Sequence, residues 1–110
     1  MIGIDIVELS RIDPEDQAFL RHVLTEEEQK ECEQRRSPHR RREYIGGRFA
    51  AKEAIFKATG DRDALSCSVL TEPSGKPYIK NHPELSVSIS HDGGYAIAAV
   101  VCSEQGGMQK

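Results

Sequence analysis

The sequence has 110 residues, the usual size of one folded domain, and leaves no room for a second independent core. Apolar residues make up 37% and tryptophan is absent, so we expect a thin aliphatic core that association between copies would help to stabilise. The net charge is −3, and 3 cysteines without C-x-x-C spacing argue for a reducing compartment. The N-terminal MIGIDIVEL has no basic leader and is charged by its fifth residue, which argues against a signal peptide or membrane span. The sequence therefore predicts a cytoplasmic protein that does not contact membranes.

The first predicted element is a strand over residues 2–7, where β-branched residues alternate with others. The alternation places Ile2, Ile4 and Ile6 on one face, which we expect to be buried. Asp5 points away from that face, from the middle of the strand. A carboxylate at such a position is costly unless another group pairs with it, so Asp5 is a candidate functional residue.

Helices are predicted next from their caps. Thr25 is followed three residues later by Glu28, a capping box that predicts a helix start. Ser37-Pro38 predicts the start of a longer helix that runs to about Thr59 and ends at a glycine. Its apolar residues follow helical spacing along one side: Ile45, Phe49, Ala50 and Phe56.

After residue 60 the apolar pattern changes from helical spacing to alternation. It predicts short strands at residues 65–70, 78–79, 85–89 and 95–101, with turn signals at 74–77 and 92–94. The whole pattern predicts an α+β fold in one domain over residues 1–110. An N-terminal strand and two to three helices would pack on a mostly antiparallel sheet. Residues 105–110 are expected to fray.

Asp5 and Glu53 are candidates for a shared cation. Glu53 lies among apolar residues of the long helix, where a lone carboxylate would favour its protonated form. Two such acids can hold a hard divalent ion such as Mg²⁺ and leave coordination positions for water and substrate phosphates. The alternative is that Glu53 only pairs with Lys57, four residues later on the same helix.

A second group of residues could bind an anionic ligand. His91 stands at a strand end beside a glycine turn, a position that suits a phosphate or base contact. A structural histidine, hydrogen-bonded at the turn, is the alternative. Arg48, Lys52 and Lys57 would supply positive charge near the acids, and the alternative for them is a solvated basic face.

Residues 35–42 contain a cluster of arginines: Arg35, Arg36, Arg40, Arg41 and Arg42. The run invites a nucleic-acid interpretation, but the chain as a whole is acidic and no stacking or zinc motif accompanies the arginines. We therefore expect no nucleic-acid partner. A basic patch is equally able to dock an acidic protein.

Taken together, segments spread over nearly the whole chain closely resemble the holo-acyl-carrier-protein synthase family, the small bacterial 4′-phosphopantetheinyl transferases. The most specific are GIDIVE at residues 3–8 and RFAAKEA at residues 48–54, at their proper distance. Other matching pieces are Arg11-Ile12, Leu24-Thr25 with Glu28, Lys57, Gly60, Gly75-Lys76-Pro77 and Val87-Ser88-Ile89-Ser90-His91. The resemblance implies the fold of that family.

It also implies an activity in fatty acid biosynthesis. The 4′-phosphopantetheine arm of coenzyme A would pass to a serine of apo acyl carrier protein, giving holo carrier protein and adenosine 3′,5′-bisphosphate. By this resemblance Asp5 and Glu53 would bind the Mg²⁺ that grips the pyrophosphate, and Lys57 would steady phosphate charge. Phosphoryl transfer needs such positioning and charge neutralisation more than covalent chemistry.

The resemblance assigns the remaining candidates to the two substrates. Arg48, Lys52 and His91 would contact the nucleotide and its 3′-phosphate. Arg11 and the run at residues 35–42 would face the acidic recognition helix of the carrier protein. The family is typically a homotrimer with each active site at a subunit boundary.

The chain departs from the family pattern in places. Gly60 is followed by Asp61-Arg62-Asp63 where the family continues with Thr-Gly-Ile, and residues 81–84 replace a longer stretch that holds a short helix. His22 stands where an arginine is frequent. The competing classes are a Mg²⁺-dependent phosphohydrolase and a non-enzymatic module that binds an acidic protein or RNA.

Overall fold

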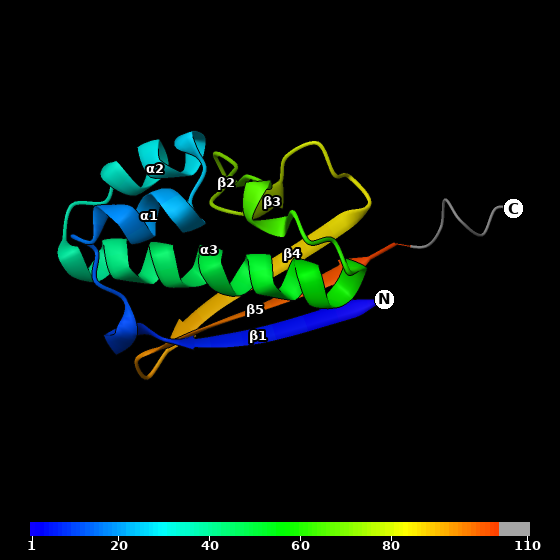
Figure 1. Cartoon of the computed structure of the whole chain (residues 1–110), viewed down its shortest axis with the longest axis horizontal. Helices are drawn as coiled ribbons and strands as arrows, with labels where there is room; N and C mark the ends of the chain where they lie inside the picture. Colours follow the sequence, from blue (N-terminus) through cyan, green and yellow to red (C-terminus); the bar gives the residue numbers. More distant parts are fainter. Residues whose placement is uncertain (104–110) are drawn as a thin grey trace, which may run out of the picture.

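The computed structural model describes residues 1–103 and confirms the predicted α+β class (Figure 1). β1, β5 and β4 form an antiparallel sheet in that order, and β2 and β3 form a separate antiparallel pair. In chain order the elements are β1 (Ile2–Glu8), η1 (Leu9–Arg11), α1 (Gln17–Val23), α2 (Glu26–Glu33), α3 (Pro38–Thr59), η2 (Ala64–Ser66), β2 (Val69–Thr71), β3 (Pro77–Ile79), β4 (Leu85–Asp92) and β5 (Tyr95–Cys102).

The long helix α3 forms the middle layer of the molecule. Figure 1 shows it lying along one face of the β1-β5-β4 sheet, with α1 and α2 on its other side. Because both sides are covered, α3 is buried around most of its circumference, which a single predicted apolar stripe did not anticipate. Phe56, expected on that stripe, is 45% exposed.

The caps that predicted the helices are present. Thr25 and Glu28 form the reciprocal capping box of α2. Ser37 caps α3 by accepting a hydrogen bond from the backbone N–H of Arg40, and Gly60 ends the helix in the left-handed conformation at φ 78°.

The predicted burial of the β1 isoleucines is wrong for the isolated chain. Ile2, Ile4 and Ile6 are 68%, 56% and 60% exposed, while Gly3, Asp5 and Val7 face α3. Alternation defines the two faces of a strand but not which one receives the helix. β5 continues the exposed apolar face with Tyr95, Ile97 and Val101.

The predicted strands match the structure except at residues 65–70. There the chain first makes the short helical turn η2, closed by a bond from the Cys67 N–H to the Ala64 carbonyl, and the strand begins only at Val69. The turn at residues 92–94 joins β4 to β5 through glycines with positive φ, as predicted. The expectation for residues 105–110 lies outside the described residues.

Candidate active site

The site is built where β1 crosses α3 at close range. A Cβ atom at Gly3 would clash with the carbonyl oxygen of Ala54 and lie 2.8 Å from the backbone nitrogen of Ala58. Only glycine permits this approach of strand backbone to helix backbone. Asp5, two residues later on the same face of β1, is thereby carried to the edge of α3.

Asp5 and Glu53 line the same cavity of about 440 Å³, and both are partly exposed to solvent. Lys57, one turn beyond Glu53 on α3, donates from Nζ to Asp5 Oδ1 at 3.1 Å and to the Ile4 carbonyl at 3.1 Å. The structure therefore brings together the predicted catalytic residues Asp5, Glu53 and Lys57. Within residues 1–103, Lys57 pairs with Asp5 on the neighbouring strand and not with Glu53 on its own helix.

The donor set at this cavity fits a Mg²⁺ ion that is completed by substrate. No group of three or more His, Cys, Asp and Glu side chains suited to a metal occurs among the described residues. A site closed entirely by protein ligands is therefore not formed by this part of the chain. Mg²⁺ commonly uses one or two carboxylates together with water and substrate phosphates, which matches Asp5 and Glu53.

Other residues of the cavity come from β1, η1, α1 and α3. They include Glu8 and Arg11, and the rings of Phe19 and Phe49 meet edge to face with centroids 5.9 Å apart. Phe49 belongs to the RFAAKEA segment, whereas Phe19 and Glu8 were not predicted to line a site. Asp16, which caps α1 by accepting from the Phe19 N–H, is the sequence signal that could have placed Phe19 on a helix.

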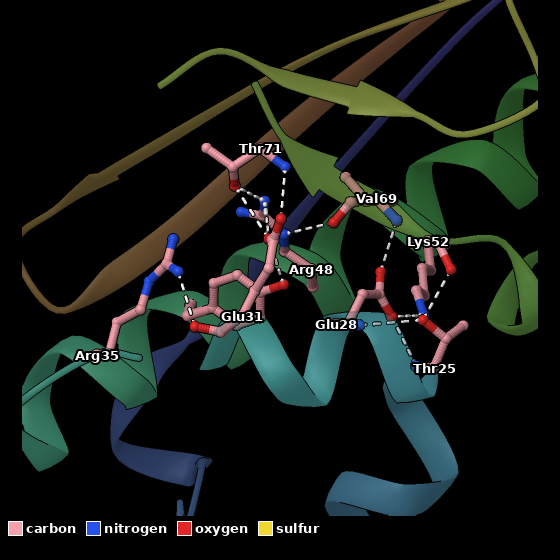
Figure 2. Close-up of polar contacts among 10 residues, drawn as sticks. Thr25, Glu28, Glu31, Arg35, Arg48, Lys52, Val69 and Thr71 are labelled. Atoms are coloured by element: carbon pink, nitrogen blue, oxygen red, sulfur yellow. Dashed lines mark hydrogen bonds and ion pairs between the residues drawn. The ribbon is translucent and has the colours of Figure 1, made fainter. Parts of the chain in front are cut away.

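Lys52 was predicted to contact the nucleotide, and the structure gives it a different place (Figure 2). Its Nζ donates to the carbonyls of Val23 at 2.7 Å and Leu65 at 3.0 Å, and pairs with Glu28 Oε1 at 2.5 Å. The Lys52 and Glu28 side chains are both 0% exposed. Burial lowers the pKa of the Lys52 ammonium, and the Glu28 carboxylate opposes that effect. An ammonium has three donors, so none is left for a phosphate, and we correct the assignment to a structural one.

Arg48 receives the same correction. It is 7% exposed and donates to the Val69 carbonyl at 2.9 Å and to Thr71 Oγ1 at 2.7 Å, as Figure 2 shows. Its guanidinium also lies 3.6 Å from Glu31 Oε1 and stacks 4.2 Å from the ring centroid of Tyr44. These contacts turn Arg48 away from solvent and join α3 to α2 and β2.

His91 lies apart from the Asp5 cavity within this chain. It is exposed, on the α3-facing side of β4, and its Nε2 is 3.1 Å from the carbonyl oxygen of Glu43. β5 separates β4 from β1, so His91 and Asp5 stand on strands roughly 10 Å apart. His91 is therefore not among the residues that line the cavity of Asp5 and Glu53 in the described part of the chain.

The family model described as "4′-phosphopantetheinyl transferase superfamily" matches residues 1–100. The chain belongs to this superfamily. It is 41% identical over 111 residues to a holo-[acyl-carrier-protein] synthase of Geobacillus sp. (strain WCH70), covering 91% of this chain and 92% of that one. A holo-[acyl-carrier-protein] synthase of Halalkalibacterium halodurans is 45% identical over 109 residues, with 90% and 91% covered.

Solved structures of the superfamily agree with the fold of this phosphopantetheinyl transferase. A holo-(acyl-carrier-protein) synthase from Bacillus anthracis in complex with CoA (3′,5′-ADP) superposes with a TM-score of 0.80 at 38% identity, covering 92% of this chain and 93% of that one. The Helicobacter pylori synthase in complex with coenzyme A gives a TM-score of 0.76 at 36% identity, covering 94% and 100%. The helices described in residues 1–103 include none that could cross a membrane.

Proposed function

We propose that this chain is a holo-acyl-carrier-protein synthase that transfers 4′-phosphopantetheine from coenzyme A to a serine of apo acyl carrier protein. In this reaction the serine oxygen bonds to the phosphorus next to pantetheine, and the bond from that phosphorus to the departing adenosine 3′,5′-bisphosphate breaks. The observation that carries the proposal is that Asp5 and Glu53 line one cavity and that Lys57 donates to Asp5 beside it. The resemblance to synthases over almost their whole length supports it.

We propose that Asp5 and Glu53 hold a Mg²⁺ ion. The ion, when bound, would neutralise charge on the pyrophosphate. Lys57 keeps Asp5 oriented through its 3.1 Å bond and has half of its side chain in solvent, so its ammonium can also meet a phosphate oxygen.

Incubation of the chain with coenzyme A, Mg²⁺ and apo carrier protein tests the function. A gain in carrier mass equal to one phosphopantetheine supports the transferase. Hydrolysis of coenzyme A without a mass gain would indicate the phosphohydrolase instead. Binding of carrier or RNA without any reaction would indicate a non-enzymatic module.

We propose that the chain works as a homotrimer whose copies pack through the exposed apolar face of the sheet. On β1 this face carries Ile2, Ile4 and Ile6, and exposed patches of this kind mark interaction surfaces. Packing of this face would explain why isoleucines that alternate like core residues lie in solvent in one chain. Light scattering on the wild type and on Ile4→Asp tests this, because a stable, active wild-type monomer would contradict it.

We propose that the arginine run docks the acyl carrier protein. Arg42 donates to the Ile12 carbonyl and Arg41 to the Arg35 carbonyl, so both are partly held inside the fold, whereas Arg36 and Arg40 are exposed. Exposed charges steer an acidic partner and are screened by salt. Arg36→Ser with Arg40→Ser should raise the KM for carrier and flatten its salt dependence, while the KM for coenzyme A stays unchanged. A rise in the coenzyme A constant would instead place these arginines at the nucleotide.

We propose a cytoplasmic location, in fatty acid biosynthesis, for a single domain over residues 1–110. The free thiols Cys32, Cys67 and Cys102 support a reducing compartment. The match of the family model to residues 1–100 supports one domain.

A further inference from the structure

A fully buried ion pair that takes no part in the proposed chemistry ties several segments together. Lys52 on α3 pairs with Glu28 on α2, and it also holds the carbonyls of Val23, at the end of α1, and Leu65, in η2. Glu28 Oε2 in turn accepts from the Val69 N–H at 2.7 Å, at the start of β2. One pair of side chains thus connects helices, the turn after α3 and the second sheet, as Figure 2 shows for Glu28, Lys52 and Val69.

The polar groups of this pair are saturated. The three ammonium donors of Lys52 have three acceptors, and Glu28 Oε1 also accepts from the Thr25 N–H at 2.8 Å. No buried side-chain nitrogen or oxygen in residues 1–103 lacks a hydrogen-bond partner. A buried ion pair is often no more stabilising than apolar residues of the same volume, but directional bonds fix where its partners lie. This pair therefore fixes where the segments bonded to it lie, which an apolar pair of the same volume would not do.

The segment that Lys52 positions forms a wall beside Glu53. A cavity of about 410 Å³ is lined by residues of this segment and of α3: Lys52, Glu53, Phe56, Asp61, Arg62, Ala64 and Leu65. The Lys52 side chain is 0% exposed, so its ammonium does not open on this cavity. Glu53 therefore faces this wall on one side and the cavity that it shares with Asp5 on the other. Lys52 directly precedes Glu53 on α3, so the bond from its Nζ to the Leu65 carbonyl ties the wall to the helix that carries the carboxylate.

We propose that Lys52 and Glu28 are a positioning pair that holds the 61–65 wall against α3 and so shapes the coenzyme A site beside Glu53 without touching coenzyme A. This inference rests on the proposed function, since coenzyme A is the ligand whose binding the wall affects. The wall carries the charged residues Asp61, Arg62 and Asp63.

A matched control exists in the neighbouring polar cluster. Glu31 accepts from the Thr71 N–H at 2.9 Å and from the Tyr44 hydroxyl at 2.9 Å, and lies 3.6 Å from Arg48. This cluster also joins α2, α3 and β2. Its hydrogen bonds from Arg48 and Glu31 end on Val69 and Thr71 and do not hold the 61–65 wall. A substitution in this cluster therefore tests the effect of general destabilisation while the bond from Lys52 to the Leu65 carbonyl stays in place.

The test compares Lys52→Met combined with Glu28→Gln, which removes both charges together, with the control Glu31→Gln. Three readouts apply to the full chain: hydrogen exchange at residues 61–68, calorimetric binding of coenzyme A, and KM values for both substrates. The double variant should exchange faster at 61–68 and bind coenzyme A about tenfold more weakly, because misplacement of a supporting wall costs affinity on that scale. Its KM for carrier should stay at the wild-type value. Glu31→Gln should leave all three readouts unchanged.

The proposal would be overturned if the double variant exchanged hydrogen and bound coenzyme A like the wild type. It would also be overturned if Glu31→Gln lost as much coenzyme A affinity as the double variant. If the double variant does not fold, Lys52→Arg keeps the charge, moves the donors and is measured by the same readouts with the same outcomes. A wild-type chain that binds coenzyme A but transfers nothing would refute the proposed function. The exchange and binding readouts would still decide the positioning role.

Discussion

α3 carries two lysines five residues apart, and each pairs with a carboxylate from another element. Lys52 and Glu28 are 0% exposed and have every polar atom satisfied, whereas the side chains of Lys57 and Asp5 are 50% and 19% exposed. The first pair faces α2 and the turn after α3. The second faces β1 and opens on the cavity beside Glu53.

The difference between these pairs shows that residue type does not separate a structural ion pair from a functional one. A saturated, buried pair has no donor for a ligand and is costly to break on one side only. A half-exposed pair contributes little to stability because water screens it, and its groups remain available to substrate. Variants at the buried pair should therefore affect mainly stability, and variants at the half-exposed pair should affect mainly activity.

Lys52→Met should have the largest effect on folding. It leaves the Glu28 carboxylate buried without its counter-charge, which costs about 3–5 kcal/mol of unfolding free energy. Denaturant unfolding measures this loss, and the double variant with Glu28→Gln should recover part of it. An unchanged midpoint for Lys52→Met would show that the pair is not buried in solution.

Asp5→Ala should reduce activity strongly and stability only slightly. Transfer should fall at least about a thousandfold, because a carboxylate that orients charge at the phosphates is lost. The free energy of unfolding should change by less than about 1 kcal/mol, since the pair with Lys57 is partly exposed. Single-turnover mass analysis gives the first quantity and denaturant unfolding the second. Near-normal transfer at low Mg²⁺ would contradict the placement of the metal.

Lys57→Met should reduce kcat by about a hundredfold, which is the usual cost of removing one group that stabilises transition-state charge. The stability change should again stay below about 1 kcal/mol. Steady-state kinetics with both substrates distinguish this from a binding defect. A rise in KM with constant kcat would mean that Lys57 binds substrate and transition state equally.

Tyr44→Phe should give the smallest effect, and its size depends on pH. Burial raises the pKa of Tyr44 above its ordinary value of 10.0, and the hydroxyl donates to Glu31. A raised folded-state pKa contributes stability that is fully present below the unfolded value and is lost as pH rises above it. The wild type should therefore exceed Tyr44→Phe by about 1 kcal/mol at pH 8, and this gap should shrink above pH 10. A gap that widens on the alkaline side in denaturant unfolding would contradict the assignment.

Local chemistry in the sequence was sufficient for the helix ends and the hairpins. The capping box at Thr25 and Glu28, proline after Ser37 and glycine at position 60 act within one turn of the chain, so their structural meaning does not depend on distant partners. The faces of β4 were also predictable, because strict alternation places Val87, Ile89 and His91 on one side.

The roles of Arg48 and Lys52 were not predictable in this way. Helical spacing placed them on one flank of a helix, and a flank can face solvent, ligand or another element. Their hydrogen-bond acceptors lie 13 to 29 residues away in the sequence. One of them is Glu28, which the sequence showed only as a member of an acidic helix.

By itself the sequence determined the α+β class, the start of α2, both ends of α3, and the GIDIVE and RFAAKEA segments that indicate the superfamily. These depend on short-range caps, on periodicity and on a specific motif. Only the tertiary structure decided that the isoleucine face of β1 is open and that Lys52 is sealed while Lys57 is not. The physical reason is that burial depends on which layer covers a face. That layer is set by long-range contacts such as Gly3 against Ala54, which no local pattern encodes.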